Sequence, residues 1–212
     1  MRLGVFFHTC LVLAAFVGPA SALDSFNPYR VGVDAAHGVY LGKGVVVTAG
    51  HVVSGEPHVN IAGKQIPAKI IKRGEGDVDL GVLVIDDHLP ELTRLGRVSL
   101  CQDPPQYGDP VLVVGVAAPR LFQSYILNPS RVPGTIPSKY EKFLIRFIPE
   151  GASGSGVFHP KTRCLLGIIT HKLSVTSAIQ VNGQPRNEIH DVANYFIPAA
   201  EIARVIPPEL RD

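Results

Sequence analysis

Short apolar runs that end at turn-forming residues restrict the fold of this chain more than any other feature. Runs rich in Val, Ile and Leu are bounded by Gly, Pro, Asp or Asn, and the 212 residues include 21 Gly and 18 Pro. Strands at this spacing, without helical periods between them, are typical of a sandwich or barrel and disfavour a βαβ fold. We expect strands at residues 44–48, 66–71, 80–85, 111–114, 143–148 and 165–170.

One helix is expected, close to the C-terminus. Pro198 suits a first helical position, and Pro207-Pro208 ends the segment. Between them, the apolar side chains of Ile202, Val205 and Ile206 share one face. Asn182-Gly183 favours a hairpin turn. Residues 102–109 (QDPPQYGD) have the composition of a linker and would divide the chain into two similar halves.

The first 22 residues have the layout of a secretory signal peptide. Arg2 precedes a largely apolar stretch to Val17, and a Gly-Pro pair and the small-residue tripeptide 20–22 (ASA) follow it. A membrane anchor fits less well, because the apolar run is shorter than the ~20 residues that a span needs. We expect cleavage after Ala22, a secreted or periplasmic mature chain of residues 23–212, and no membrane span in that mature chain.

Charge and cysteine usage exclude several functions. The 20 Lys plus Arg against 18 Asp plus Glu give a formal charge of only +2, so there is no electrostatic reason to expect nucleic acid as a partner. Cys10 belongs to the signal segment, whereas Cys101 and Cys164 can form one disulfide in an oxidising compartment. The sequence leaves open whether they meet. Neither lies in a zinc-binding spacing, and no metal or other cofactor is expected.

Three short motifs carry candidate chemistry. They are 48–53 (TAGHVV), 77–83 (DVDLGVL) and 151–158 (GASGSGVF), which present a histidine, an acid and a serine in that order. A serine hydroxyl becomes a good nucleophile when a neutral imidazole accepts its proton, and a carboxylate fixes the tautomer of that imidazole. Glycines beside the serine let backbone N–H groups approach a developing oxyanion. Each motif is weak alone, but their order on an all-β background is specific.

The order of the motifs also disfavours an esterase of the α/β-hydrolase fold. The α/β-hydrolases run serine, acid, histidine and carry Gly-x-Ser-x-Gly, whereas Ser155 occupies the position of the last glycine here. The sequence Asp86-Asp87-His88 also pairs an acid with an imidazole, but it follows a strand and is interpreted as a solvated surface turn.

These motifs resemble those of the chymotrypsin-like (trypsin-like) serine peptidases, particularly the compact bacterial members related to the HtrA and glutamyl endopeptidase groups. Residues 48–51 (TAGH) resemble the family's Thr-Ala-Ala/Gly-His box, and residues 79–83 (DLGVL) resemble its Asp-Leu-Ala-x-Leu box. Residues 151–155 (GASGS) are similar to its Gly-Asn/Asp-Ser-Gly-Gly/Ser box. The resemblance extends over about residues 39–206. It implies two six-stranded antiparallel β-barrels, at about 28–104 and 110–206, with a short C-terminal helix.

The resemblance also implies the roles of the site residues. His51 would be the general base, Asp79 its orienting carboxylate and Ser153 the nucleophile, while the backbone N–H groups of Gly151 and Ser153 would form the oxyanion hole. Asp77 competes for the role of the acid. Asp79 is preferred, because the family places the acid directly before the apolar run.

Substrate specificity is less well defined by the sequence. The primary pocket is expected to be lined by residues just before the nucleophile loop and by the strand after it, namely Phe147, Ile148, Pro149, Thr170, His171 and Lys172. No acid lies at the position of the trypsin pocket base, so cleavage after Lys or Arg is not indicated. The apolar wall favours an apolar substrate side chain, His171 and Lys172 can accept an acidic one, and a third interpretation places both at a solvent-facing strand end.

Two departures from the family pattern concern activation. Ala152 stands where digestive trypsins have an Asp that pairs with a newly freed N-terminus. Arg30-Val31-Gly32 looks like an activation site, but Val31 lies only 20 positions before His51, too close for the family. We therefore expect signal removal alone to give active enzyme.

The sequence thus predicts an exported serine endopeptidase that hydrolyses protein or peptide substrates through an acyl-enzyme intermediate, as a monomer by default. The alternative is a catalytically silent protease-like domain that binds a partner through the same cleft. The presence of all three triad residues argues against silence. An exported β-sandwich binding module would not explain the order and spacing of the motifs.

Overall fold

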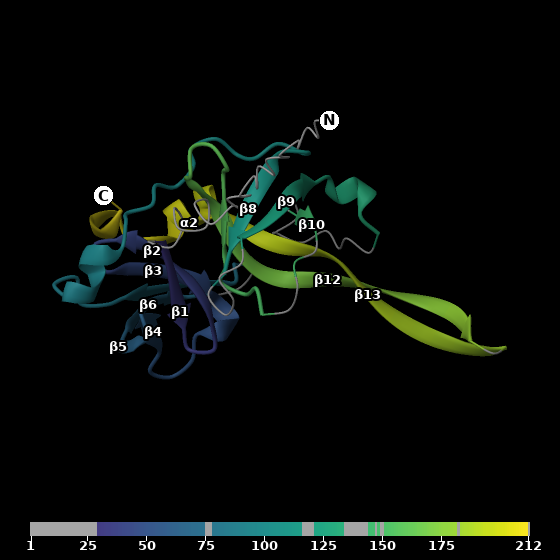
Figure 1. Cartoon of the computed structure of the whole chain (residues 1–212), viewed down its shortest axis with the longest axis horizontal. Helices are drawn as coiled ribbons and strands as arrows, with labels where there is room; N and C mark the ends of the chain where they lie inside the picture. The colour runs from purple at the N-terminus through teal and green to yellow at the C-terminus, as the bar shows by residue number, and fades with distance from the viewer. Residues whose placement is uncertain are drawn as a thin grey trace, which may run out of the picture.

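Two antiparallel β-sheets contain most of the regular structure in the computed structural model (Figure 1). The structure describes residues 29–74, 78–115, 121–133, 144–146, 148, 151–181 and 183–211. The first sheet has seven strands in the order β5-β4-β1-β2-β3-β7-β6, and the second is a closed six-stranded barrel in the order β10-β13-β12-β11-β8-β9. We call them the first and second lobes.

The first lobe is built from short strands whose β-branched residues are buried. All five residues of β3, Val45–Ala49, are buried, as are the first four of β7, Leu80–Val84. The other strands are β1 Arg30–Val33, β2 Ala36–Gly42, β4 His58–Ile61, β5 Lys64–Pro67 and β6 Lys69–Arg73. Two 3₁₀ turns, η2 Gly50–Val52 and η3 Pro90–Arg94, follow β3 and β7 in the chain.

The second lobe closes through its longest strands. β12 pairs with both β11 and β13, and β13 pairs in turn with β10. The strands are β8 Pro110–Val114, β9 Leu121–Leu127, β10 Leu144–Arg146, β11 Gly156–Phe158, β12 Leu165–Val181 and β13 Gln184–Pro198. The helix α2 Ala199–Val205 follows β13, and the 3₁₀ turns are η4 Pro129–Arg131 and η5 Pro208–Leu210.

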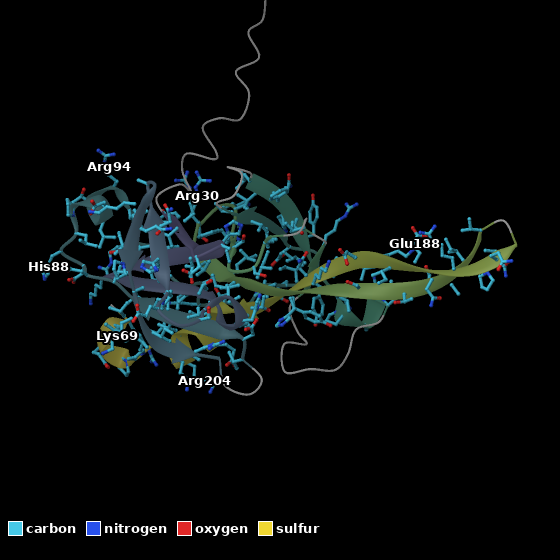
Figure 2. The ribbon with its side chains drawn as sticks, turned by 90° about the horizontal axis from the view of Figure 1, so that it is seen from below. Arg30, Lys69, His88, Arg94, Glu188 and Arg204 are labelled. Carbon is cyan, nitrogen blue, oxygen red and sulfur yellow. A yellow bond between two sulfur atoms is a disulfide. The ribbon has the colours of Figure 1, made fainter. Side chains whose placement is uncertain are left out.

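The far halves of β12 and β13 form a two-stranded arm that extends away from both lobes (Figure 1). The two strands stay paired along the arm, and the last residue pair is Val181 with Gln184. Glu188 lies on this arm, far from the other labelled side chains (Figure 2). The first six residues of β12 are buried, whereas most residues beyond them are exposed or half-buried.

An apolar core joins the two lobes. Val39, Val47 and Leu80 of the first lobe belong to one buried cluster with side chains of the second, namely Phe158, Leu165, Ile168, Ile197 and Ile202. Each lobe also has a buried cluster of its own. Burial of apolar surface at about 25 cal/mol per Å² is the main force that holds such lobes together. The shared cluster therefore fixes the position of one lobe against the other.

The predicted all-β architecture with two antiparallel sheets and a short C-terminal helix is confirmed. The first lobe has seven described strands where the resemblance implied six. The single strand expected at 66–71 is two strands, because β5 ends at Pro67 and the Ala68 N–H donates to the carbonyl of Pro57. Pro198 ends β13 and caps the helix instead of beginning it.

The segment that connects the lobes, between η3 and β8, is bonded covalently to the second lobe. Cys101 and Cys164 form a disulfide with a Cα–Cα distance of 5.1 Å, and Leu100 bridges to Leu165 beside it. The predicted signal segment 1–22, Asn182 of the predicted turn, and residue 28 at the predicted start of the first barrel lie outside the described residues. Within the described ranges, no helix combines the length and apolar character needed to cross a membrane.

Candidate active site

Two neighbouring strands of the first lobe bring His51 and Asp79 together. β3 and β7 are antiparallel partners, with Ala49 opposite Leu80, so the end of β3 lies beside the start of β7. His51 lies two residues beyond β3, in η2, and Asp79 directly precedes β7. The Gly50 N–H donates to the carbonyl of Asp79 at 2.9 Å, and this bond holds the end of β3 against the start of β7.

The Asp79 carboxylate is bound to His51 through both oxygens. Oδ1 accepts the His51 backbone N–H at 2.7 Å, and Oδ2 lies 2.6 Å from Nδ1 of the ring. The Asp79 side chain is 14% exposed and that of His51 is 42% exposed. A carboxylate that holds Nδ1 fixes the proton there, which leaves Nε2 as an acceptor aimed at the cleft.

Ser153 reaches the same point from a tight loop of the second lobe. Gly151 and Gly154 have φ angles of +82° and +81°, which only glycine adopts without strain. The Ser155 N–H donates to the carbonyl of Ala152 within the loop at 2.9 Å, and the Gly154 N–H donates to Ile169 at 2.8 Å. These bonds fix the loop against the buried part of β12.

The loop that carries Ser153 also contacts the first lobe directly. The backbone N–H of His37, on β2, donates to the carbonyl of Ser153 at 3.1 Å. A Cβ at residue 154 would overlap the carbonyl oxygen of His37, so the two backbones approach closely there. Thr48 Oγ1 donates to that same carbonyl at 2.5 Å. The position of Ser153 relative to His51 is therefore set at the contact between the lobes.

Burial lowers the pKa of the His37 imidazole below its usual value. A hydrogen bond with the Gly151 backbone acts in the opposite direction, and the nearby charge of Arg30 lowers the pKa further. The residue is 6% exposed. Burial thus favours the neutral form of the His37 imidazole, at the residue whose backbone contacts the Ser153 loop.

The three side chains predicted from the motifs are joined in series by two hydrogen bonds. Ser153 Oγ lies 3.2 Å from His51 Nε2, and His51 Nδ1 lies 2.6 Å from Asp79 Oδ2. The Ser153 hydroxyl has a second acceptor within reach, the carbonyl of Thr170 at 3.3 Å. Asp77, the competing acid, lies outside the described residues. Residues 86–88 are exposed, and the His88 N–H donates to Asp86 Oδ1 at 3.0 Å, as expected of a surface turn.

His171 meets the same carboxylate, which the sequence did not indicate. Its Nδ1 lies 3.5 Å from Asp79 Oδ2, and its ring centroid lies 5.3 Å from that of His51. The register of β12 against β13 shifts between Ile169 and Lys172, so β12 has one extra residue there. Such a bulge changes the direction of side chains. The only signal in the sequence was the position of His171 at the end of an apolar run.

A depression of about 420 Å³ lies beside Ser153. Of the residues expected in the substrate pocket, Ile148, Thr170, His171 and Lys172 line it, whereas Phe147 and Pro149 lie outside the described residues. The other lining residues are Gly151, Ala152, Ser153, Ile169 and Asn194. Gly151 and Ser153 also line a second depression, which includes Asp34 and Val52 of the first lobe. Ser153 therefore borders both depressions.

A family model described as a trypsin-like peptidase domain matches residues 36–168, more than half of the chain. That range includes His51, Asp79 and Ser153. No curated protein matches the sequence significantly.

Solved structures of proteases share the fold. The active form of the Rv3671c protease from M. tuberculosis is 18% identical with a TM-score of 0.61, and the match covers 96% of this chain and 92% of that one. Kallikrein-related peptidase 10 is 16% identical with a TM-score of 0.61, over 87% of this chain and 96% of that one. At such identities the likeness concerns the fold.

Proposed function

The chain belongs to the trypsin-like peptidase family, and from this premise we propose that it is an active serine endopeptidase with His51, Asp79 and Ser153 as its catalytic residues. The observation that carries the proposal is the continuous line from the Asp79 carboxylate through both ring nitrogens of His51 to Ser153 Oγ. A separation of 3.2 Å between base and nucleophile is at the edge of hydrogen-bond reach, as is common before substrate binds.

The reaction then proceeds in two steps. His51 Nε2 takes the proton of Ser153 as Oγ attacks the scissile carbonyl, and it returns that proton to the leaving amine, which gives an acyl-enzyme. Asp79 keeps the other proton on Nδ1 and stabilises the imidazolium. Water, activated by the same imidazole, releases the acyl group. We assign the oxyanion hole to the backbone N–H groups of Gly151 and Ser153.

The depression lined by Ile148 and Thr170 is the proposed pocket for the substrate side chain. Its described lining residues include no carboxylate, which disfavours Lys and Arg. Lys172 Nζ already lies 3.1 Å from Asp191, and His171 faces Asp79. Because the Lys172 ammonium and the His171 imidazole each have a carboxylate beside them, an apolar side chain is favoured over an acidic one.

Export is part of the proposal. The pattern of residues 1–22 supports a signal peptide that is cleaved after Ala22, and the Cys101–Cys164 disulfide supports an oxidising compartment. The boundaries proposed for the two barrels, about 28–104 and 110–206, stay predictions.

Labelling with a fluorophosphonate probe tests the function. The chain of residues 23–212 should be labelled at Ser153, and Ser153→Ala should abolish the labelling. Ser155→Ala is the matched control, because Ser155 lies in the same loop but its side chain is buried. A folded native protein that is not labelled would leave the binding-domain alternative. Cleavage of a peptide library then reads the preferred side chain.

A further inference from the structure

Three metal-binding side chains from separate parts of the chain converge beside the nucleophile. His51 lies after β3, Asp79 lies before β7, and His171 lies on the bulge of β12. One ligand atom from each lies within 4.8 Å of the others. We propose that these residues form a Zn²⁺ site and that the bound ion switches the peptidase off. The inhibition rests on the proposed function, whereas the binding does not.

The donor set suits zinc. Two imidazole nitrogens and one carboxylate oxygen are ligands that Zn²⁺ binds at about 2.0–2.2 Å, usually in tetrahedral geometry with water able to take a fourth position. The side chains of His51 and His171 are 42% and 51% exposed, so an ion can enter from solvent. Asp79 is 14% exposed and its Oδ1 stays anchored to the His51 backbone N–H while Oδ2 turns to the ion.

The distances indicate how the ion would fit. Ligand atoms of a tetrahedral zinc lie about 3.3 Å apart, from the bond lengths above. The 3.5 Å between His171 Nδ1 and Asp79 Oδ2 is already close to this value. The 2.6 Å between His51 Nδ1 and the same oxygen is the length of a hydrogen bond and must increase. The two imidazoles lie within 4.8 Å through their ligand atoms, so side-chain rotations of His51 and His171 bring the set to zinc-binding distances.

The movement of His51 makes metal binding and catalysis mutually exclusive. A neutral imidazole carries one proton, and when Nδ1 binds the ion that proton lies on Nε2. Nε2 then has no lone pair for the proton of Ser153, so the nucleophile loses its base. The hydrogen bond that Asp79 makes to Nδ1 is lost at the same time. The ion would thus inhibit through the tautomer of His51.

Calorimetric titration with Zn²⁺, and visible absorption on titration with Co²⁺, measure binding without activity. The native chain should bind one ion, and His171→Gln should weaken binding about tenfold or more. His88→Gln is the matched control, because it removes an exposed histidine beside Asp86 and Asp87, the other cluster of possible ligands among the described residues. It should bind as the native chain does. Circular dichroism checks that each variant is folded.

Activity is measured as a ratio, with and without Zn²⁺, for each variant. Zn²⁺ should slow fluorophosphonate labelling of the native chain, a chelator should restore it, and His171→Gln should lose most of this sensitivity whatever its basal rate. Absence of Zn²⁺ binding, or binding that is unchanged in either His171→Gln or His51→Gln, would overturn the three-ligand site. Binding that depends on His171, in a chain that the probe never labels, would support the metal site and refute the peptidase.

Discussion

The two lobes hold their parts of the site in different ways. His51 and Asp79 lie at the ends of directly paired strands of one sheet, so their hydrogen bonds are set by local register. Ser153 lies on a loop whose position depends on contacts with β12 and with His37 of the other lobe. The geometry of the His51–Asp79 pair is therefore set within one sheet, whereas the distance from His51 to Ser153 is set by the contact between the lobes. Changes in the two regions should have different consequences.

The largest effect is expected from Asp79→Asn, which damages the pair inside the first lobe. An amide in place of the carboxylate favours the wrong tautomer of His51, and kcat should fall by about 10⁴-fold. The contact between lobes is unaffected, so the fold should stay intact by circular dichroism. Steady-state hydrolysis of a peptide substrate measures the loss. A decrease of less than about tenfold would point to another acid, Asp77 being the candidate.

Gly154→Ala tests the contact between lobes. The new Cβ would overlap the carbonyl oxygen of His37, and φ is +81°, so the loop must shift. A displacement of about 1 Å lowers activity by about 100-fold, and the combined strain should lower the free energy of unfolding by roughly 2–5 kcal/mol. Kinetics and urea unfolding measure the two effects.

The matched control for this change is Gly183→Ala. Gly183 has a φ of +77° but nothing within 4 Å of its would-be Cβ, so it carries the backbone strain without the clash. It should lose about 1 kcal/mol and keep full activity. Equal effects of the two substitutions would show that close approach of the backbones is not what positions Ser153.

Removal of the disulfide should lower stability more than activity. The bridge closes a segment with a sequence separation of 63 and ties the connection between lobes to the start of β12. In the double variant Cys101→Ala, Cys164→Ala, the free energy of unfolding should fall by about 2–4 kcal/mol, as measured in urea. The His51–Asp79 pair lies elsewhere, so kcat of the folded fraction should be retained. A large loss of kcat would mean that the connection helps to position the lobes.

The same distinction explains what the sequence could predict. The bounds of β3, β7 and β8 agree with the predicted ones to within one or two residues. Continuous apolar runs rich in valine and leucine indicate such buried strands in the sequence itself. The far part of β12 has no apolar run, since its pairing with β13 leaves most of its side chains exposed, and only the turn at 182–183 indicated it. Whether Cys101 meets Cys164 depends on distances across the fold, which spacing does not give.

The site shows the same limit. The residues His51, Asp79 and Ser153 could be named from local motifs, and the structure places them in one line. The approach of His171 to Asp79 depends on a one-residue bulge and on the packing of one lobe against the other. His37 likewise carries no motif, although its backbone contacts both Ser153 and Thr48.

The smallest expected effect concerns pH and the buried His37 at the contact between lobes. Its pKa is lowered in the folded chain, first by burial, so the unfolded chain binds more protons as the pH falls below about 6.5. The free energy of unfolding should therefore fall with acidification below that value, by at most about 1.4 kcal/mol per pH unit from this residue. His37→Gln should make the decline shallower. Urea unfolding at a series of pH values, in a Ser153→Ala background that prevents self-digestion, measures both slopes. Equal slopes would mean that the acid sensitivity comes from other groups than His37.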